Sequence, residues 1–267
     1  MKKLFALALV LSMVIGLVPA LASGNNVANV FYGGGTPQSG DPALNSASNG
    51  SNVIKLSHAG LYGFQWVDGV AGLAPELASG YTLSDDKLTY TFTLREGLKW
   101  SDGSDFMVQE LADSWKRAAS TELGADYGYM FEIIDGYPDN LNIAVDETAR
   151  TFTVVLKAPA PYFIDLAAFP TFYPVKVANA DIEGVWATKP ETNIGMGPFR
   201  MTAYRVDDVI AFEKNEYYWN ADQVKLDGVN AYLAEDNAAI LAAYESGAAH
   251  FSNSIDPVEF DRINATY

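Results

Sequence analysis

The sequence predicts a mixed α/β fold in which strands alternate with helices. Residues 88–94 alternate leucine, tyrosine and phenylalanine with threonine, which is the period of a half-buried strand. Near the C-terminus, a strand at 229–233, a helix ending at Ser246 and a strand at 249–252 form a crossover that favours parallel pairing. Apolar residues make up 49% of the chain and the charges are interspersed, which indicates a folded protein.

The N-terminus has the three parts of a secretory signal peptide. Lys2 and Lys3 precede an apolar run that ends at Val18, and residues 20–22 (Ala-Leu-Ala) form a small-residue cleavage site. The run has about 15 residues, fewer than the roughly 20 that a membrane-spanning helix needs. We therefore expect residues 1–22 to be removed and the rest of the chain to be exported.

The N-terminal third is expected to contain two strands, a helix and a turn. Residues 27–32 form a short strand, and a segment rich in Gly, Ser, Asn and Pro follows at 33–50. Residues 54–66 are apolar and predict a helix that leads into a strand. A turn at 81–86 precedes the strand at 88–94.

An amphipathic helix is predicted at 108–119, because Val108, Leu111 and Trp115 recur on one face. Periodicity and turn residues then predict a strand at 151–156, a short helix at 162–169, and a strand pair at 201–204 and 209–213. Asp236 or Asn237 caps the last helix, and Gly247 ends it.

The charge and the lack of cysteine exclude several classes of function. With 33 acidic against 17 basic residues, the surface repels nucleic acid and anionic lipid. The chain has no cysteine, so it forms no disulfide, offers no thiolate and has no lipobox cysteine to accept a lipid. Together with the signal peptide, this predicts a soluble protein of the periplasm or the extracellular space.

The residues point to neither catalysis nor metal binding. His58 and His250 lie far apart and have no partner at metal-ligand spacing. No G-x-S-x-G or calcium-loop motif occurs, and the paired acids fall in predicted turns. We expect no catalytic residue, no metal site and no cofactor. An exported carbohydrate-active enzyme stays open as an alternative, because two of the many carboxylates could oppose each other across a groove.

Several segments resemble one family in the right order along the chain. Residues 94–103 (LREGLKWSDG) and 114–117 (SWKR) resemble the signature of the bacterial extracellular solute-binding proteins of family 5, which are the oligopeptide, dipeptide and nickel receptors of ABC importers. Further similar segments are APELA at 74–78, GPF at 197–199, EKNEYYW at 213–219 and AAYESG at 242–247.

The resemblance implies a periplasmic-binding-protein-like fold of type II, cluster C. A mixed-sheet domain I would comprise residues 23–55 and 169–267, and domain II would be inserted between them at 56–168. Family members continue into a second lobe. We therefore expect this chain to correspond to the N-terminal half of such a receptor, with the second lobe missing.

The resemblance also implies where a ligand would bind. In peptide-binding members, backbone groups after the first strand pair with an extended peptide as in β-augmentation. The matching residues here are Gly34, Gly35, Thr36, Pro37 and Gln38. A tyrosine after the tryptophan-bearing helix also faces the ligand, and Tyr127 or Tyr129 holds that place. For each residue, ordinary packing is the alternative. Members often have an acidic side chain in the first stretch, where this chain has Gly35-Thr36.

By this resemblance, the chain captures oligopeptides and delivers them to the permease subunits of an ABC importer, as a monomer and without catalysis. Nickel chelates and oligosaccharides remain alternatives within the family, and a remnant of a longer gene is another. Because such receptors close two lobes on the ligand, we expect this half alone to bind weakly or not at all.

One departure concerns the start of the helix at 108–119. Members place threonine at the N-cap and an acid three residues later. This chain has the acid, Glu110, but has Met107 at the N-cap. Methionine has no oxygen that could accept the exposed N–H groups, so we expect the cap to be lost. On this basis Met107→Thr stabilises the fold by roughly 1 kcal/mol.

Overall fold

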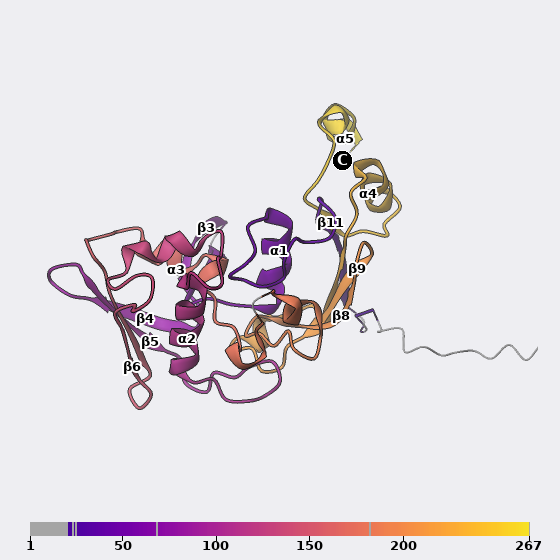
Figure 1. The fold of residues 1–267 in the computed structure, drawn as a ribbon. Helices are drawn as coiled ribbons and strands as arrows, with labels where there is room; N and C mark the ends of the chain where they lie inside the picture. The colour runs from indigo at the N-terminus through magenta and orange to yellow at the C-terminus, as the bar shows by residue number, and fades with distance from the viewer. Residues whose placement is uncertain (1–20, 23, 25, 68, 182, 267) are drawn as a thin grey trace, which may run out of the picture.

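The structure, a computed structural model, describes residues 21, 22, 24, 26–67, 69–181 and 183–266. The predicted signal peptide lies outside these residues except for Leu21 and Ala22. Two sheets lie at opposite ends of the molecule, and helix α1 (Ser48–Ser57) lies between them (Figure 1). The predicted mixed α/β class is confirmed.

The larger sheet has the strand order β11-β1-β10-β9-β8. Strand β1 (Val27–Phe31) pairs in parallel with β10 (Gly228–Tyr232) on one side and with β11 (Phe251–Ser252) on the other. The strands β8 (Phe199–Arg205) and β9 (Val209–Lys214) form the predicted antiparallel pair. The predicted crossover is parallel, but β1 lies between its two strands.

The second sheet has the order β4-β5-β7-β6, and all of its pairs are antiparallel. It comprises β4 (Ala78–Leu83), β5 (Thr89–Leu94), β6 (Ile143–Asp146) and β7 (Thr151–Val155). The strands predicted at 88–94 and 151–156 are confirmed as β5 and β7. The turn predicted at 81–86 is wrong in its first half. Tyr81 belongs to β4, where it pairs with Phe92 of β5, and its ring packs against those of Tyr62 and Tyr90.

A hairpin of β2 (Tyr62–Val67) and β3 (Val70–Pro75) forms a separate two-stranded sheet. A strand was expected at the position of β2, whereas β3 was not expected. Alanine and glycine dominate the first part of β3 and give no period-two signal. The preceding helix α1 also begins earlier than predicted, inside the polar segment at 33–50.

Helix α2 (Val108–Ala119) packs against the second sheet and has the predicted bounds. Its Trp115 is fully buried among Phe131, Phe152 and Phe172, and the indole N–H donates to the Phe172 carbonyl at 2.8 Å. The remaining α-helices are α3 (Phe163–Ala167), α4 (Asn237–Glu245) and α5 (Phe260–Thr266). Short 3₁₀ turns occur at Gly128–Ile133, Pro170–Phe172, Val177–Asn179, Val185–Thr188, Ala221–Gln223 and Pro257–Glu259.

The start of α2 is capped from a distant turn, so the expectation of a lost cap was wrong. The Glu147 carboxylate, which follows β6, accepts the N–H groups of Val108 at 3.0 Å and Gln109 at 2.8 Å. Glu110 accepts the Met107 N–H at 2.9 Å. The N–H groups of Val108 and Gln109 at the helix start therefore already have an anionic acceptor without a threonine at position 107.

We expect Glu147→Ala to lower the free energy of unfolding by about 1 kcal/mol, because it removes this cap and its favourable charge at the helix start. Urea denaturation measures the change. Glu122→Ala is the control, because Glu122 is exposed and takes no part in a cap. Equal midpoints for the two variants would show that Glu147 does not cap α2, and a clear gain from Met107→Thr would point the same way.

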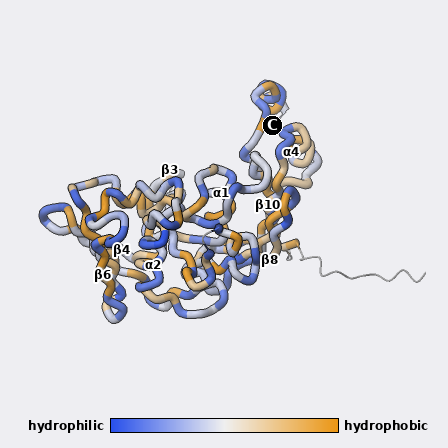
Figure 2. Tube along the Cα trace, in the orientation of Figure 1, coloured by the Kyte–Doolittle hydropathy of each residue, from blue (hydrophilic) through white to orange (hydrophobic). Residues whose placement is uncertain are grey.

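Apolar residues concentrate along the strands, and hydrophilic residues along the connecting loops (Figure 2). Across the described ranges, no helix combines the length and the hydrophobicity needed to cross a membrane.

Candidate functional site

Three parallel strands end at one edge of the larger sheet, and α4 and α5 project beyond this edge (Figure 1). Ligands of open α/β sheets bind outside the carboxyl ends of such strands. The segments that leave the edge are 32–38 after β1, 233–236 after β10 and 253–254 after β11. The predicted site residues of the first segment therefore lie where the topology favours a ligand.

The glycine segment after β1 is held by side chains on both sides. The Gly33 N–H donates to Asn253 Oδ1 at 3.0 Å, and the amide of Asn49 donates to the Gly34 carbonyl at 2.9 Å. Gly34 and Gly35 have φ values of 97° and 68°, which favour glycine. Gly34 is exposed, and its N–H has no hydrogen-bond partner among the described residues. This N–H is free to meet a ligand.

The rest of the segment divides into anchored and exposed residues. The Thr36 hydroxyl donates to Asp207 Oδ1 at 2.6 Å and accepts the Asp207 N–H at 2.8 Å, which ties the segment to the turn between β8 and β9. Pro37 is buried, whereas Gln38 is exposed. Thr36 and Pro37 therefore position the segment, and Gly34 and Gln38 face solvent.

A carboxylate that the sequence analysis missed lies over the glycine segment. A Cβ atom added to Gly35 would lie 2.5 Å from Oε1 of Glu235, which follows β10. The Glu235 side chain therefore fills the place where an acidic side chain at position 35 would start. Glu235 is exposed and forms no ion pair or hydrogen bond with the described residues. The only signal for it was its position directly after a parallel strand.

The two candidate tyrosines are placed differently. Tyr127 is half-buried, its ring packs edge-on against Phe169, and its hydroxyl lies 3.5 Å from the Ser46 carbonyl. Ser46 lies just before α1, in the same stretch as the Asn49 that holds Gly34. Tyr129 is 58% exposed, and its ring contacts that of Tyr127. The structure thus links Tyr127 to the glycine segment and leaves Tyr129 facing solvent.

A buried ion pair fixes the chain just after the glycine segment. Asp41 is fully buried and accepts hydrogen bonds from Arg117 of α2 at 2.7 Å and from the indole N–H of Trp186 at 2.9 Å. It also accepts the Ala43 N–H at 2.9 Å. Three distant parts of the chain meet at this carboxylate.

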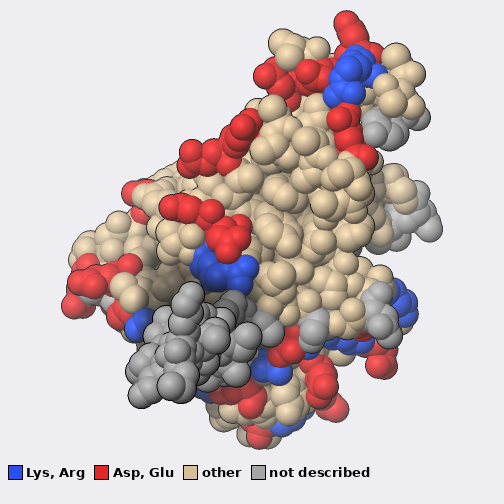
Figure 3. Space-filling view, turned by 90° about the vertical axis from the view of Figure 1, so that its right-hand side faces the viewer, with Lys and Arg blue, Asp and Glu red and all other residues tan. Residues whose placement is uncertain are grey.

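The surroundings of the site are acidic. On the face shown in Figure 3, acidic side chains outnumber basic ones and surround a broad uncharged centre. Asp207, Glu235 and Asp236 all lie in the segments that leave the sheet edge or next to them. Such a field favours ligands with positively charged groups. In the described part of the chain, no three His, Asp or Glu side chains come together as a metal site would require.

Comparison with known proteins shows what this arrangement is similar to. Residues 72–266 match the model of the bacterial extracellular solute-binding proteins, family 5, middle region. The oligopeptide-binding protein OppA of Bacillus subtilis is 33% identical over 223 residues, which are 79% of this chain and 40% of that protein.

Solved structures of proteins named as oligopeptide-binding or OppA are also similar to this chain. The periplasmic oligopeptide-binding protein OppAIV of Borrelia burgdorferi superposes with a TM-score of 0.83 at 26% identity, over 90% of this chain and 50% of that one. The Listeria monocytogenes OppA bound to peptide gives a TM-score of 0.75 at 30% identity, over 85% and 46%.

The chain spans less than half the length of the curated relatives that it matches. The matched region nevertheless includes every strand of the two larger sheets except β1, together with α2, α4 and α5. The resemblance seen in the signature segments is therefore confirmed. This chain belongs to the bacterial extracellular solute-binding proteins of family 5.

Proposed function

We propose that this chain forms one wall of an extracytoplasmic receptor that captures oligopeptides and passes them to the permease subunits of an ABC importer. The observation that carries this proposal is the exposed Gly34 N–H at the carboxyl edge of three parallel strands. An extended peptide pairs with such a backbone edge through main-chain hydrogen bonds. The relatives named as oligopeptide-binding proteins support it.

In this proposal, the peptide lies along Gly34, Gly35, Thr36, Pro37 and Gln38. Tyr127 packs beside the stretch that holds this segment, and Tyr129 offers an exposed ring to a peptide side chain. The chain binds and releases its ligand as a monomer, without catalysis. Members of this family are solute-binding proteins, which supports a role in recognition.

The proposal includes the organisation that the resemblance implies. It comprises an exported chain, a fold of type II, cluster C, and a domain I at 23–55 and 169–267 that is interrupted by a domain II at 56–168. Support comes from the larger sheet, in which β1 pairs with strands from residues 228 onward while the second sheet lies between them in sequence. Because the relatives are longer, the opposite wall of the cleft would come from a second lobe, and binding to this chain alone is weak.

Amide NMR on the chain labelled with ¹⁵N tests the proposal even when binding is weak. Adding trialanine should shift the amide signals of Gly34 and Gly35. Gly69, at the tip of the β2–β3 hairpin, and Gly124, after α2, serve as internal controls. Shifts confined to other regions would contradict the proposed site, and shifts produced by a nickel chelate but not by the peptide would favour the alternative receptor.

A second prediction concerns Glu235, which we expect to receive the N-terminal ammonium of the peptide. Glu235→Gln should weaken binding of trialanine by about tenfold, because a charge-assisted hydrogen bond is lost. N-acetyl-trialanine has no ammonium and should bind the two proteins equally. Glu132→Gln, at an exposed position in the 3₁₀ turn after α2, is the control. An equal loss for both peptides would show that Glu235 acts only through the shape of the loop.

A further inference from the structure

One asparagine in the first turn of α1 holds the glycine segment of the candidate site. The side-chain amide of Asn49 donates through Nδ2 to the carbonyl of Gly34 at 2.9 Å and to that of Gly35 at 3.3 Å. Its Oδ1 atom accepts the N–H of Gly50 at 2.9 Å. Because carbonyls only accept and an N–H only donates, these partners fix which way the amide points. The Nδ2 atom therefore holds both glycines.

The residue after Asn49 is a glycine, and this is the only Asn-Gly pair in the 267 residues. Asparagine is one of the chemically unstable residues, and glycine, which has no Cβ, is the least hindered residue that can follow it. A glycine is also required here, because a Cβ atom at position 50 would collide with the side chain of Asn45. The residue that holds the candidate site is therefore followed by the neighbour that exposes its side chain most to attack.

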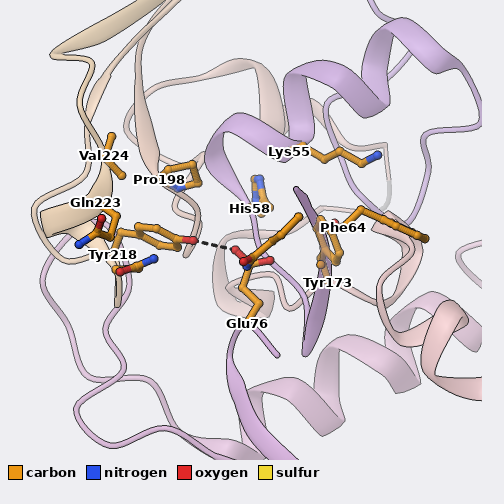
Figure 4. A pocket seen from close by; sticks show the side chains of 12 residues that line it. Lys55, His58, Phe64, Glu76, Tyr173, Pro198, Tyr218, Gln223 and Val224 are labelled. Carbon is orange, nitrogen blue, oxygen red and sulfur yellow. Dashed lines mark hydrogen bonds between the residues drawn. The ribbon is translucent and has the colours of Figure 1, made fainter. Parts of the chain in front are cut away.

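The two ends of α1 are held unequally. His58 follows the last helical residue, is buried at the wall of the pocket shown in Figure 4, and donates its N–H to the Ile54 carbonyl at 2.8 Å. At the start, the N-cap Ala47 has no side-chain oxygen to accept an N–H group. The helical hydrogen bonds begin with the Ser51 N–H, which donates to the Ala47 carbonyl at 3.1 Å, so the Gly50 N–H lies outside them. Local opening of the first turn therefore breaks fewer contacts than opening of the last one.

We propose that Asn49-Gly50 is a site of spontaneous deamidation, and that the reaction releases the glycine segment. When the first turn opens, the Gly50 nitrogen attacks Cγ of Asn49. A C–N bond forms, the Cγ–Nδ2 bond breaks, and Nδ2 leaves as ammonia with the proton of the Gly50 N–H. Water then opens the succinimide ring and leaves a carboxylate on an aspartyl or isoaspartyl residue. The leaving nitrogen is the one that holds Gly34 and Gly35.

The product cannot hold the segment in the same way. A carboxylate has no N–H, so the carbonyls of Gly34 and Gly35 lose their donor and face a negative charge at hydrogen-bond distance. The Gly33 N–H and the Thr36 hydroxyl keep their own partners on either side. We therefore expect the two glycines to become mobile while their neighbours stay anchored.

Mass spectrometry on the full chain tests the chemistry without any ligand. The folded protein is kept in a mildly alkaline buffer, because base removes the proton of the attacking nitrogen, and samples are digested with trypsin at intervals. Fragmentation of the peptide that ends at Lys55 locates each conversion of amide to acid, and a sample digested at the start corrects for conversion during digestion.

Asn45 and Asn52 lie in the same tryptic peptide and serve as internal controls. We expect Asn49 to convert first and to yield isoaspartate as well as aspartate, while Asn45 and Asn52 stay intact. Equal conversion at the three asparagines, or none at Asn49, would overturn the proposal.

Amide NMR on the ¹⁵N-labelled chain tests the release of the segment. Second sets of Gly34 and Gly35 signals should grow at the rate of conversion, and the variant Asn49→Asp should show shifted signals from the start. Asn52→Asp is the matched control. It adds the same charge in α1, where the Asn52 side chain forms no hydrogen bond with the described residues, and should leave both signals in place. Conversion with unmoved glycine signals would overturn the release, and the aged unmodified chain decides the question even if Asn49→Asp fails to fold.

The effect on peptide binding rests on the proposed function, because it requires the peptide to lie along Gly34 and Gly35. On that basis Asn49→Asp should weaken binding of trialanine by about fivefold, which corresponds to one lost hydrogen bond of ordinary strength. If trialanine binds neither form while the second glycine signals appear, the proposed function fails and the deamidation site stands.

Discussion

Asp41→Ala should lower the free energy of unfolding by about 3–5 kcal/mol, because it leaves the Arg117 guanidinium without its buried partner. Arg117 donates to both carboxylate oxygens, at 2.7 and 3.3 Å, and Trp186 loses its acceptor in the same variant. The side chain of Asp41 is 0% exposed and that of Arg117 only 12%, so water replaces little of what is lost. Urea denaturation measures the effect.

The exposed pair Lys99–Asp105 provides the matched control. Its ions are 2.6 Å apart, but the side chains are 38% and 81% exposed. Exposed pairs contribute about 0–1 kcal/mol, so Asp105→Ala should change stability little. Asp41→Asn keeps the shape of the side chain, so its loss of stability should lie between those of Asp41→Ala and Asp105→Ala. Equal losses for Asp41→Ala and Asp105→Ala would show that Asp41 does not hold the segment after β1 in place.

Stability should decline as the pH falls from about 6.5 to 4, in part because His58 must become charged inside the protein. Burial lowers the pKa of His58 to about 4, and the nearby Asp41 carboxylate opposes this shift only partly. In the unfolded chain a histidine has a pKa of about 6.5. The unfolded state therefore binds the proton first, and neutral His58 contributes stability that is fully present above pH 6.5.

Linkage sets the size of this contribution at roughly 3 kcal/mol, lost progressively across that pH window. Carboxylates also titrate there, so the informative quantity is the difference between the chain and its His58→Gln variant. Denaturant midpoints measured at several pH values should fall more steeply for the unmodified chain. Parallel pH profiles would show that His58 does not stay neutral in the folded protein.

Local patterns predicted much of the fold. The alternation at 88–94 became β5, and the apolar face of residues 108–119 became α2 with the predicted bounds. Asp236 caps α4 through a 2.9 Å bond from the Ala238 N–H, and Gly247 follows with φ of 77°. These elements depend on residues within a turn or two of one another, so their patterns are visible in the chain itself.

Other features have no local signal. β3 lacks a period-two pattern, because alanine and glycine occupy much of it, and it is recognised only by its pairing with β2. The cap of α2 comes from Glu147, which lies 39 positions beyond Val108. Met107 alone therefore suggested a missing cap, although the fold supplies one from the turn after β6.

In the candidate site, too, some features follow from local sequence patterns and others only from the tertiary structure. The signature segments predicted the family and directed attention to Gly34, Gly35, Thr36, Pro37 and Gln38. They did not reveal Glu235, because only the parallel pairing of β1 with β10 brings this residue over Gly35. Nor did they show that Thr36 is anchored to Asp207 while the Gly34 N–H stays open to solvent.

By itself, the sequence determined the family, the fold class, the acidic surface and the stretch after the first strand as the candidate site. Periodicity, turn chemistry and charge are properties of neighbouring residues or of composition, so they need no coordinates. Only the tertiary structure decided which carboxylates are buried, which cap a helix and which have no partner among the described residues. Asp41 meets Arg117 across 76 positions and Trp186 across 145, and the Glu76–Tyr218 contact spans 142. Such pairs form because packing removes them from water together, a condition that no local pattern in the chain records.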